Sequence, residues 1–175
     1  MRQFFPILGG IAATMLLASA AHAGDGKSRA SFGYTHYDST GGELGMITAR
    51  YGYQPYKYIG IEGELSTGIV DETVTVGTQT ADIGVDIAYG LYSTVQVPFD
   101  RLGSNVFVRA GYQEIHFDLE SGATTAEGEL KGLGYGGGLN VMFTVHHGLR
   151  MEYTRVEGED DENADTYSLS YVLRF

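Results

Sequence analysis

The chain has 175 residues, a formal net charge of −11 and no cysteine. The acidic balance excludes a basic surface for nucleic acid, and we expect no nucleic-acid partner. Because no disulfide is available, a fold of this size must be closed by backbone pairing or by burial of a core. Glycine is abundant, with 26 residues, and tyrosine reaches 13 against only 3 prolines. This composition favours tight strands and turns over helices.

Residues 1–23 predict a secretory signal peptide. A basic start at Arg2 precedes a largely apolar run over residues 4–18, and Ala21-His22-Ala23 has the small-x-small pattern of a cleavage site. The alternative, a single membrane anchor, is disfavoured because the run is shorter than the roughly 20 residues that a spanning helix needs. We therefore expect cleavage after Ala23 and a mature domain over residues 24–175.

Eight later segments alternate between apolar and polar residues, which is the pattern of β-strands with one apolar face. In one of them, Ile59, Ile61 and Leu65 alternate with Glu62 and Glu64. The segments are residues 29–37, 44–53, 57–66, 82–96, 105–118, 129–143, 148–156 and 166–175. No part of the mature chain keeps a 3.6-residue apolar period or resembles a membrane helix. If the mature chain spans a membrane, it must therefore do so as a closed barrel, in which every strand pairs with two neighbours.

The alternation breaks within residues 105–118. Apolar residues occupy every second position as far as Tyr112 and then resume one position out of step at Ile115. A β-bulge inserts one extra residue into a strand and shifts the side chains in this way. We therefore expect a bulge at Gln113 or Glu114.

The links between the segments alternate in length. The short links are residues 54–56, 98–104 and 145–147, and the longer, polar links are residues 67–81, 119–128 and 157–165. Short periplasmic turns and longer extracellular loops are typical of bacterial outer-membrane barrels. The link over residues 67–81 could instead continue the wall as an outer hairpin. Tilted strands of about 10 residues span close to 25 Å, and the length left for the links favours eight strands over ten.

The closing segment alternates down to the last residue, with Tyr171, Leu173 and Phe175 on its apolar face. It resembles the carboxy-terminal signal strand of bacterial outer-membrane β-barrels, and the block from Leu149 to Tyr153 is similar to the penultimate strand of small barrels of the OmpA, OmpX and opacity-protein type. The resemblance implies an all-β fold, an eight-stranded antiparallel up-and-down transmembrane β-barrel, in the outer membrane of a Gram-negative envelope. It also implies that Tyr171, Leu173 and Phe175 form an assembly signal for the barrel-assembly machinery.

The polar faces of the segments would place charged side chains inside the barrel. These are Arg50, Glu62, Glu64, Asp86, Arg109, Arg150 and Glu152. Such groups cannot be left unpaired in a narrow, low-dielectric interior. Because an eight-stranded barrel is just wide enough for side chains to fill, we predict an ion-paired plug, with a narrow pore as the alternative.

Two sets of charged residues are candidates for contacts outside the barrel. Lys131 and Arg155 fall on the outward face near the outer strand ends, where they could meet lipopolysaccharide phosphates. We expect the clustered carboxylates of the last long link to form a solvated, self-repelling acidic loop, with weak binding of a divalent cation as the alternative. These carboxylates are Glu157, Glu159, Asp160, Asp161 and Glu162. We expect no other metal site and no cofactor.

The resemblance implies an envelope protein with a structural or surface-interaction role, such as an adhesin or resistance factor with a host or matrix ligand, and we expect a monomer. His36 and His116 lie near predicted outer strand ends, but neither has a nucleophile at a motif spacing, and we expect no catalytic residue. A lipid A-modifying hydrolase is the enzymatic alternative. A soluble periplasmic ligand-binding barrel is disfavoured because its apolar series would have to face inward.

Overall fold

The computed structural model describes residues 27–39, 42–70, 72–76, 79–121, 124–158 and 163–175. The predicted signal peptide lies outside these residues. No helix in the described part of the chain is long and apolar enough to cross a membrane. The described residues form nine strands. They are β1 (Ser28–Ser39), β2 (Gly42–Tyr53), β3 (Ile59–Val70), β4 (Glu72–Val76), β5 (Gln79–Pro98), β6 (Asn105–Ser121), β7 (Thr124–Met142), β8 (His147–Gly158) and β9 (Asn163–Arg174).

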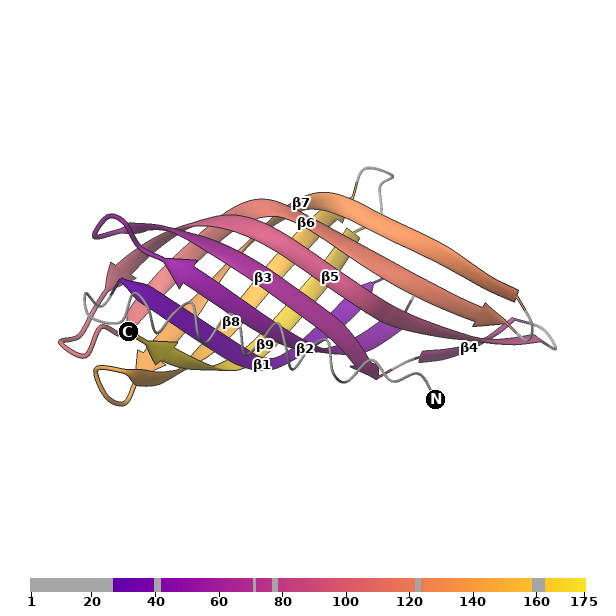
Figure 1. The fold of residues 1–175 in the computed structure, drawn as a ribbon, viewed down its shortest axis with the longest axis horizontal. Helices are drawn as coiled ribbons and strands as arrows, with labels where there is room; N and C mark the ends of the chain where they lie inside the picture. Colours follow the sequence, from indigo (N-terminus) through magenta and orange to yellow (C-terminus); the bar gives the residue numbers. More distant parts are fainter. Residues whose placement is uncertain (1–26, 40–41, 71, 77–78, 122–123, 159–162) are drawn as a thin grey trace.

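Eight of the strands close into an antiparallel barrel (Figure 1). Within the circle each strand pairs with the next along the chain, except that β3 pairs directly with β5, and β1 pairs with β9 to complete the circle. The short strand β4 lies outside this circle of eight and forms a hairpin with the start of β5. The predicted eight-stranded up-and-down barrel is confirmed.

Two of the links predicted as long are largely strand. The hairpin interpretation of residues 67–81 is confirmed, since β4 pairs with β5 from Glu72–Ile83 to Val76–Gln79. The loop predicted at residues 119–128 is wrong, because β6 and β7 stay paired as far as Ser121 and Thr124. Polar composition alone does not separate a loop from a hairpin, and threonines suit strands well. As a result β5, β6 and β7 extend beyond the other strands at one end (Figure 1).

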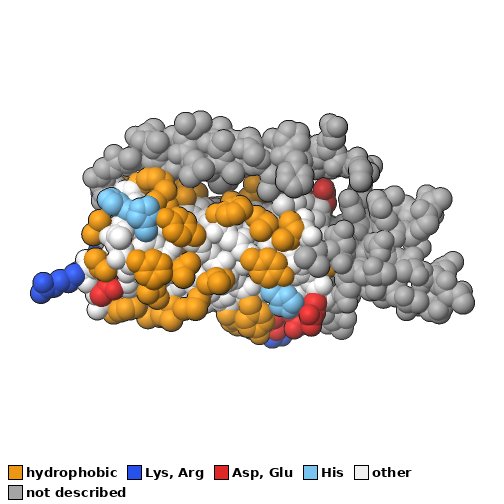
Figure 2. Space-filling model, turned by 90° about the horizontal axis from the view of Figure 1, so that it is seen from below, with side chains coloured by type: hydrophobic (Ala, Val, Ile, Leu, Met, Phe, Trp, Pro, Cys, Tyr) orange, Lys and Arg blue, Asp and Glu red, His pale blue; other side chains and the backbone are white. Residues whose placement is uncertain are grey.

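The outward face of the wall is apolar, as the alternation predicts. Leu91, Val108 and Leu169 are 67%, 58% and 54% exposed. Figure 2 shows hydrophobic side chains covering the visible wall, with charged side chains towards its ends. An apolar outside of this kind is suited to lipid.

The bulge predicted at Gln113 or Glu114 is wrong. β6 pairs with β7 without interruption through both residues. The register shift lies instead in β5, between Val85 and Ile87, where Asp86 is the extra residue opposite β6. The change of apolar parity in β6 has another cause, since Ile115 is fully buried inside the barrel.

Candidate functional site

A network of buried ion pairs fills part of the barrel interior. Glu64 on β3 accepts hydrogen bonds from Arg50 on β2 and from Arg109 on β6, each at 2.7 Å. Glu152 on β8 lies 3.3 Å from Arg50 and 3.2 Å from Arg109. All four side chains are almost completely buried. Each carboxylate is therefore shared between arginines of different strands, and the network fixes several parts of the wall to one another.

The pair between Arg150 and Glu62 crosses the interior. Two guanidinium nitrogens of Arg150 donate to the two carboxylate oxygens of Glu62, at 2.7 and 2.9 Å. Arg150 lies on β8 and Glu62 on β3, and three strands separate β8 from β3 in either direction around the barrel. Arg150 also donates to its neighbour Glu152 at 2.7 Å. The two-bond pair therefore bridges opposite walls.

The composition of the network differs from the prediction in two residues. Asp86 is exposed, because the bulge in β5 turns it out of the interior, so its predicted place inside is wrong. Arg29, which was not predicted, reaches Glu62 at 3.4 Å and donates to Gln96. Among the described residues the network thus holds four arginines and three glutamates. Arg29 lies on the same face of β1 as Ser31 and Thr35, which are buried. This alternation could have identified Arg29 as an inward-facing residue.

Two aromatic rings inside the barrel support the arginines. The Arg109 guanidinium lies 3.7 Å from the centre of the Tyr92 ring, and that of Arg150 lies 4.0 Å from the centre of the Phe107 ring. Such stacking stabilises a desolvated cation. The Tyr92 hydroxyl donates to Gln113 at 2.6 Å. Neither ring was predicted as a site residue, although each shares its parity with the buried polar residues of its strand.

Glycines of β7 make room for these rings. A Cβ atom at Gly134 would lie 2.9 Å from the Tyr92 hydroxyl oxygen, and one at Gly138 would lie 2.9 Å from the Phe107 ring. Both distances are too short for a real Cβ contact. The small inward-facing glycines of β7 therefore leave the space that the large rings on β5 and β6 occupy.

The interior also contains an apolar layer, which the sequence did not predict. It comprises Tyr37, Leu44, Met46, Val85, Ala88, Ile115, Leu130, Val156 and Ala164. Tyr37 lies near the end of β1, Leu44 near the start of β2 and Ala164 near the start of β9, which places the layer towards the outer ends of the strands. We call it the apolar layer and the arginine–glutamate network the ionic layer. The two layers lie at different levels of the interior.

The predicted lipopolysaccharide contacts lie on the outward face, and each is already ion-paired. Lys131 Nζ lies 2.5 Å from Glu129, and Arg155 lies 3.7 Å from Asp165. Glu157 faces outward too and accepts a hydrogen bond from the Tyr135 hydroxyl. The other carboxylates proposed as weak cation ligands, Glu159, Asp160, Asp161 and Glu162, lie outside the described residues.

The predicted assembly residues lie at the end of β9, where the chain closes on its first strand. The backbone N–H of Phe175 donates to the carbonyl of Ser28 at 2.9 Å. Tyr171 is 48% exposed on the outer face and contacts His147 through its hydroxyl. The arrangement leaves Tyr171 facing outward at the end of the barrel wall.

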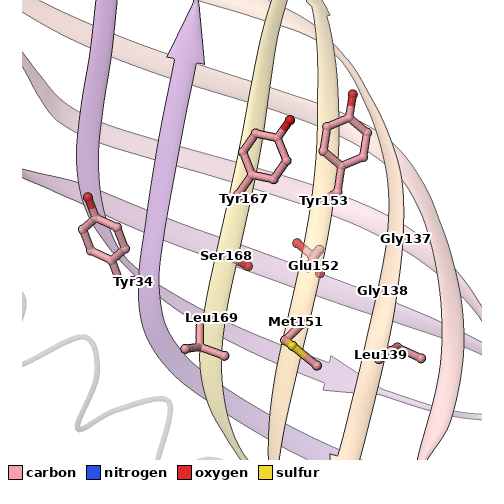
Figure 3. A pocket seen from close by; sticks show the side chains of 10 residues that line it. All are labelled: Tyr34, Gly137, Gly138, Leu139, Met151, Glu152, Tyr153, Tyr167, Ser168 and Leu169. Atoms are coloured by element: carbon pink, nitrogen blue, oxygen red, sulfur yellow. The ribbon is translucent and has the colours of Figure 1, made fainter.

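A hollow of about 510 Å³ interrupts the outward face over β7, β8, β9 and β1. Gly137 lies there opposite Tyr153 and has no side chain to fill the space. Figure 3 shows the Tyr153 and Tyr167 rings side by side, with both hydroxyls pointing the same way. The Tyr153 hydroxyl donates to Asp165 at 2.7 Å. The lining is otherwise mainly apolar, as expected for a lipid-facing surface.

Comparisons with known proteins agree with this geometry. The family model described as outer membrane protein beta-barrel domain matches residues 9–175. No curated protein matches the chain. Among solved structures, the attachment invasion locus protein Ail of Yersinia pestis is 16% identical with a TM-score of 0.63, over 87% of this chain and 100% of that one. OprG of Pseudomonas aeruginosa is 11% identical with a TM-score of 0.64, over 85% and 96%.

One further structure shows Ail of Yersinia pestis in complex with the heparin analogue sucrose octasulfate. It is 15% identical to this chain with a TM-score of 0.62, over 87% of this chain and 100% of that one. At such identities these likenesses concern the fold.

Proposed function

Because the chain belongs to the outer membrane protein β-barrel domain family, we propose that this integral outer-membrane barrel is non-conducting and serves as a scaffold for its cell-surface hairpins. The observation that carries the proposal is the two-bond pair of Arg150 and Glu62 across the interior. An ion passing through would have to break buried pairs, each of which is costly to separate. It would then meet the apolar layer, whose side chains offer little to replace its water of hydration.

Conductance in planar bilayers tests the proposal. We expect no steady conductance from the purified barrel, in contrast to a narrow pore. Different mobility of boiled and unboiled samples on a gel would establish that the inserted protein is folded. Steady single-channel currents from such a sample would overturn the proposal.

We propose that the surface partner is cationic. The chain carries a net charge of −11, and six carboxylates occur within residues 157–165. Ail of Yersinia pestis was crystallised with a polyanion, but an acidic surface repels such a ligand. Cells that express the protein should therefore bind a basic matrix peptide rather than immobilised heparin. Replacing the acids of residues 157–162 by their amides should remove this binding, and equal retention on heparin would contradict the proposal.

Lipopolysaccharide is the proposed lipid partner of Lys131 and Arg155. Both residues face outward, and their long side chains can carry a charge to the headgroup level. Since each is paired with a carboxylate, a phosphate must compete with that carboxylate. Lys131→Gln and Arg155→Gln should reduce the amount of lipopolysaccharide that co-purifies with the barrel, and unchanged amounts would exclude these contacts.

Export and assembly complete the proposal. We expect cleavage after Ala23, which mass spectrometry of the amino terminus tests, and a monomer in detergent. Removal of Phe175 should slow folding by the barrel-assembly machinery, measured as the folded fraction after pulse labelling. We propose no catalytic role. Among the described residues, the side chains of His36 and His116 form ion pairs with the carboxylates of Glu43, Glu114 and Glu129.

A further inference from the structure

Four polar side chains form a square on the outward face of β6 and β7. Glu114 and His116 are two residues apart on β6 and therefore share a face. On β7, Lys131 lies opposite Glu114 and Glu129 opposite His116. Neighbouring strands are about 4.8 Å apart, so the paired backbones hold the four side chains in a fixed arrangement.

His116 lies between the two carboxylates. Its Nε2 atom is 3.0 Å from Glu114 Oε1, and its Nδ1 atom is 3.9 Å from Glu129 Oε2. One ligand atom from each of the three residues can be chosen so that all lie within 4.8 Å of one another. A tetrahedral zinc ion with bonds of about 2.0 Å separates its ligand atoms by about 3.3 Å. Small side-chain rotations therefore suffice to bring the three atoms to a shared ion.

The Tyr89 side chain supports the cluster from β5. Its ring centre is 5.8 Å from that of His116, and its hydroxyl is hydrogen-bonded to Glu114. A hydrogen-bonded ligand carboxylate beside an oriented imidazole is the arrangement found around many protein metal sites. Tyr89 therefore limits the freedom of two of the three candidate ligands.

Lys131 already holds a positive charge between the carboxylates. Its Nζ atom lies 2.5 Å from Glu129 and 3.4 Å from Glu114. With a neutral imidazole, the square carries two negative charges and one positive charge. The side chain of Lys131 is flexible and one-third exposed, so the ammonium can leave while the carboxylates stay.

We propose that Glu114, His116 and Glu129 bind a divalent transition metal of the zinc class, which displaces the Lys131 ammonium. An imidazole with two carboxylates suits zinc, whereas calcium and magnesium take oxygen ligands. Three protein ligands leave a fourth position open to water or to an outer ligand. The three ligands lie on β6 and β7, so a bound ion would join these two strands on the outward face.

Calorimetric titration of the folded barrel with zinc chloride tests the site, with calcium chloride as the control. We expect one zinc equivalent that perturbs the His116 ring signals in NMR spectra, and no comparable response to calcium. His116→Gln should lower the affinity by more than about tenfold, and Glu129→Gln should lower it as well. Because these residues are partly exposed, the variants should fold, which gel mobility checks.

Two variants test whether zinc binds at this site rather than at other histidines. They also test whether the cluster binds a metal or is only structural. The double variant His146→Gln with His147→Gln removes two adjacent histidines at the β7–β8 turn and should leave the binding of one zinc equivalent unchanged. Lys131→Gln removes the competing ammonium and should tighten zinc binding severalfold. Undiminished zinc binding by His116→Gln, or weaker binding by Lys131→Gln, would overturn the proposal.

Discussion

Arg150 and Glu62 are 88 residues apart in the sequence and are joined by two hydrogen bonds across the barrel interior. Glu62 also faces Arg29 and Arg109, at 3.4 and 3.2 Å. A single carboxylate therefore contacts guanidinium groups of three different strands. Its removal would leave buried positive charge without a partner.

Glu62→Gln should destabilise the barrel strongly. Removal of one partner from a buried ion pair costs about 3–5 kcal/mol, because the remaining charge stays buried. Urea titration in detergent, with the folded fraction read from gel mobility, measures the effect. Glu157→Gln, which changes an exposed carboxylate, is the matched control and should change stability little. Equal stability of the two variants would show that the ionic layer does not stabilise the fold.

Gly134→Ala should destabilise the barrel by about 1–3 kcal/mol, the range for overpacking of a filled interior. The nearest atoms to the added Cβ all belong to the Tyr92 side chain, the closest at 2.9 Å. Tyr92→Leu in the same chain should therefore recover part of the loss. Gly63→Ala is the control, since nothing lies within 4 Å of its Cβ. Additive effects of the two interior substitutions in a double-mutant cycle would contradict the proposed contact.

Gly103→Ala should loosen the turn between β5 and β6. Gly103 has a φ angle of 90°, which favours glycine, and the new Cβ would meet the Arg174 guanidinium at 2.0 Å. Arg174 donates to the carbonyls of Leu102 and Val145, at 2.7 and 3.0 Å, and so links the β5–β6 turn and the β7–β8 turn to the last strand. We expect faster amide hydrogen exchange in both turns. Exchange confined to one turn would show that Arg174 does not link them.

The same turn should respond to acid. Hydrogen bonds from Ser104, first through its side chain, together with the backbone N–H of Gly103, hold the pKa of Asp100 below its ordinary value of 3.8. A carboxyl group whose pKa is lower in the folded state stabilises that state above the unfolded pKa, and this contribution is lost as the pH falls through the folded pKa. The protection factors of the Gly103 and Ser104 amides, which correct the exchange rates for their intrinsic pH dependence, should therefore fall below about pH 4, and Asp100→Asn should remove this dependence. Protection factors in the wild-type turn that stay constant down to pH 2 would contradict this role.

The alternation of apolar and polar residues predicted well which side of the wall each residue faces. It predicted poorly at which level along the barrel axis the residue lies. In β8 and β9 every second residue is buried, so Arg150, Glu152 and Leu169 lie on the predicted faces. The pattern says which side a residue faces but not at which level of the barrel it lies. For this reason a polar interior was predicted throughout, and the inward position of Ile115 was interpreted as a bulge.

The incorrect position of Asp86 has a different origin. The extra residue in β5 is visible only in the register between β5 and β6, and strand pairing depends on contacts far apart in the sequence. For Arg29 the sequence alone could show that the residue faces inward, because it shares the alternation of its strand. It could not show that Glu62 is its partner. A single strand cannot reveal which residue faces it across a barrel.

The ionic layer also bears on the order in which the barrel forms. Its carboxylates come from β3 and β8, and its arginines from β1, β2, β6 and β8. Hairpins between neighbouring strands can form early, since their loops are short. The pair of Glu62 and Arg150 can form only when β3 and β8 face each other in a nearly complete circle. An open sheet can form only the local pairs, Arg50 with Glu64 on neighbouring strands and Arg150 with Glu152 on one strand. The pair across the interior stabilises the closed barrel alone.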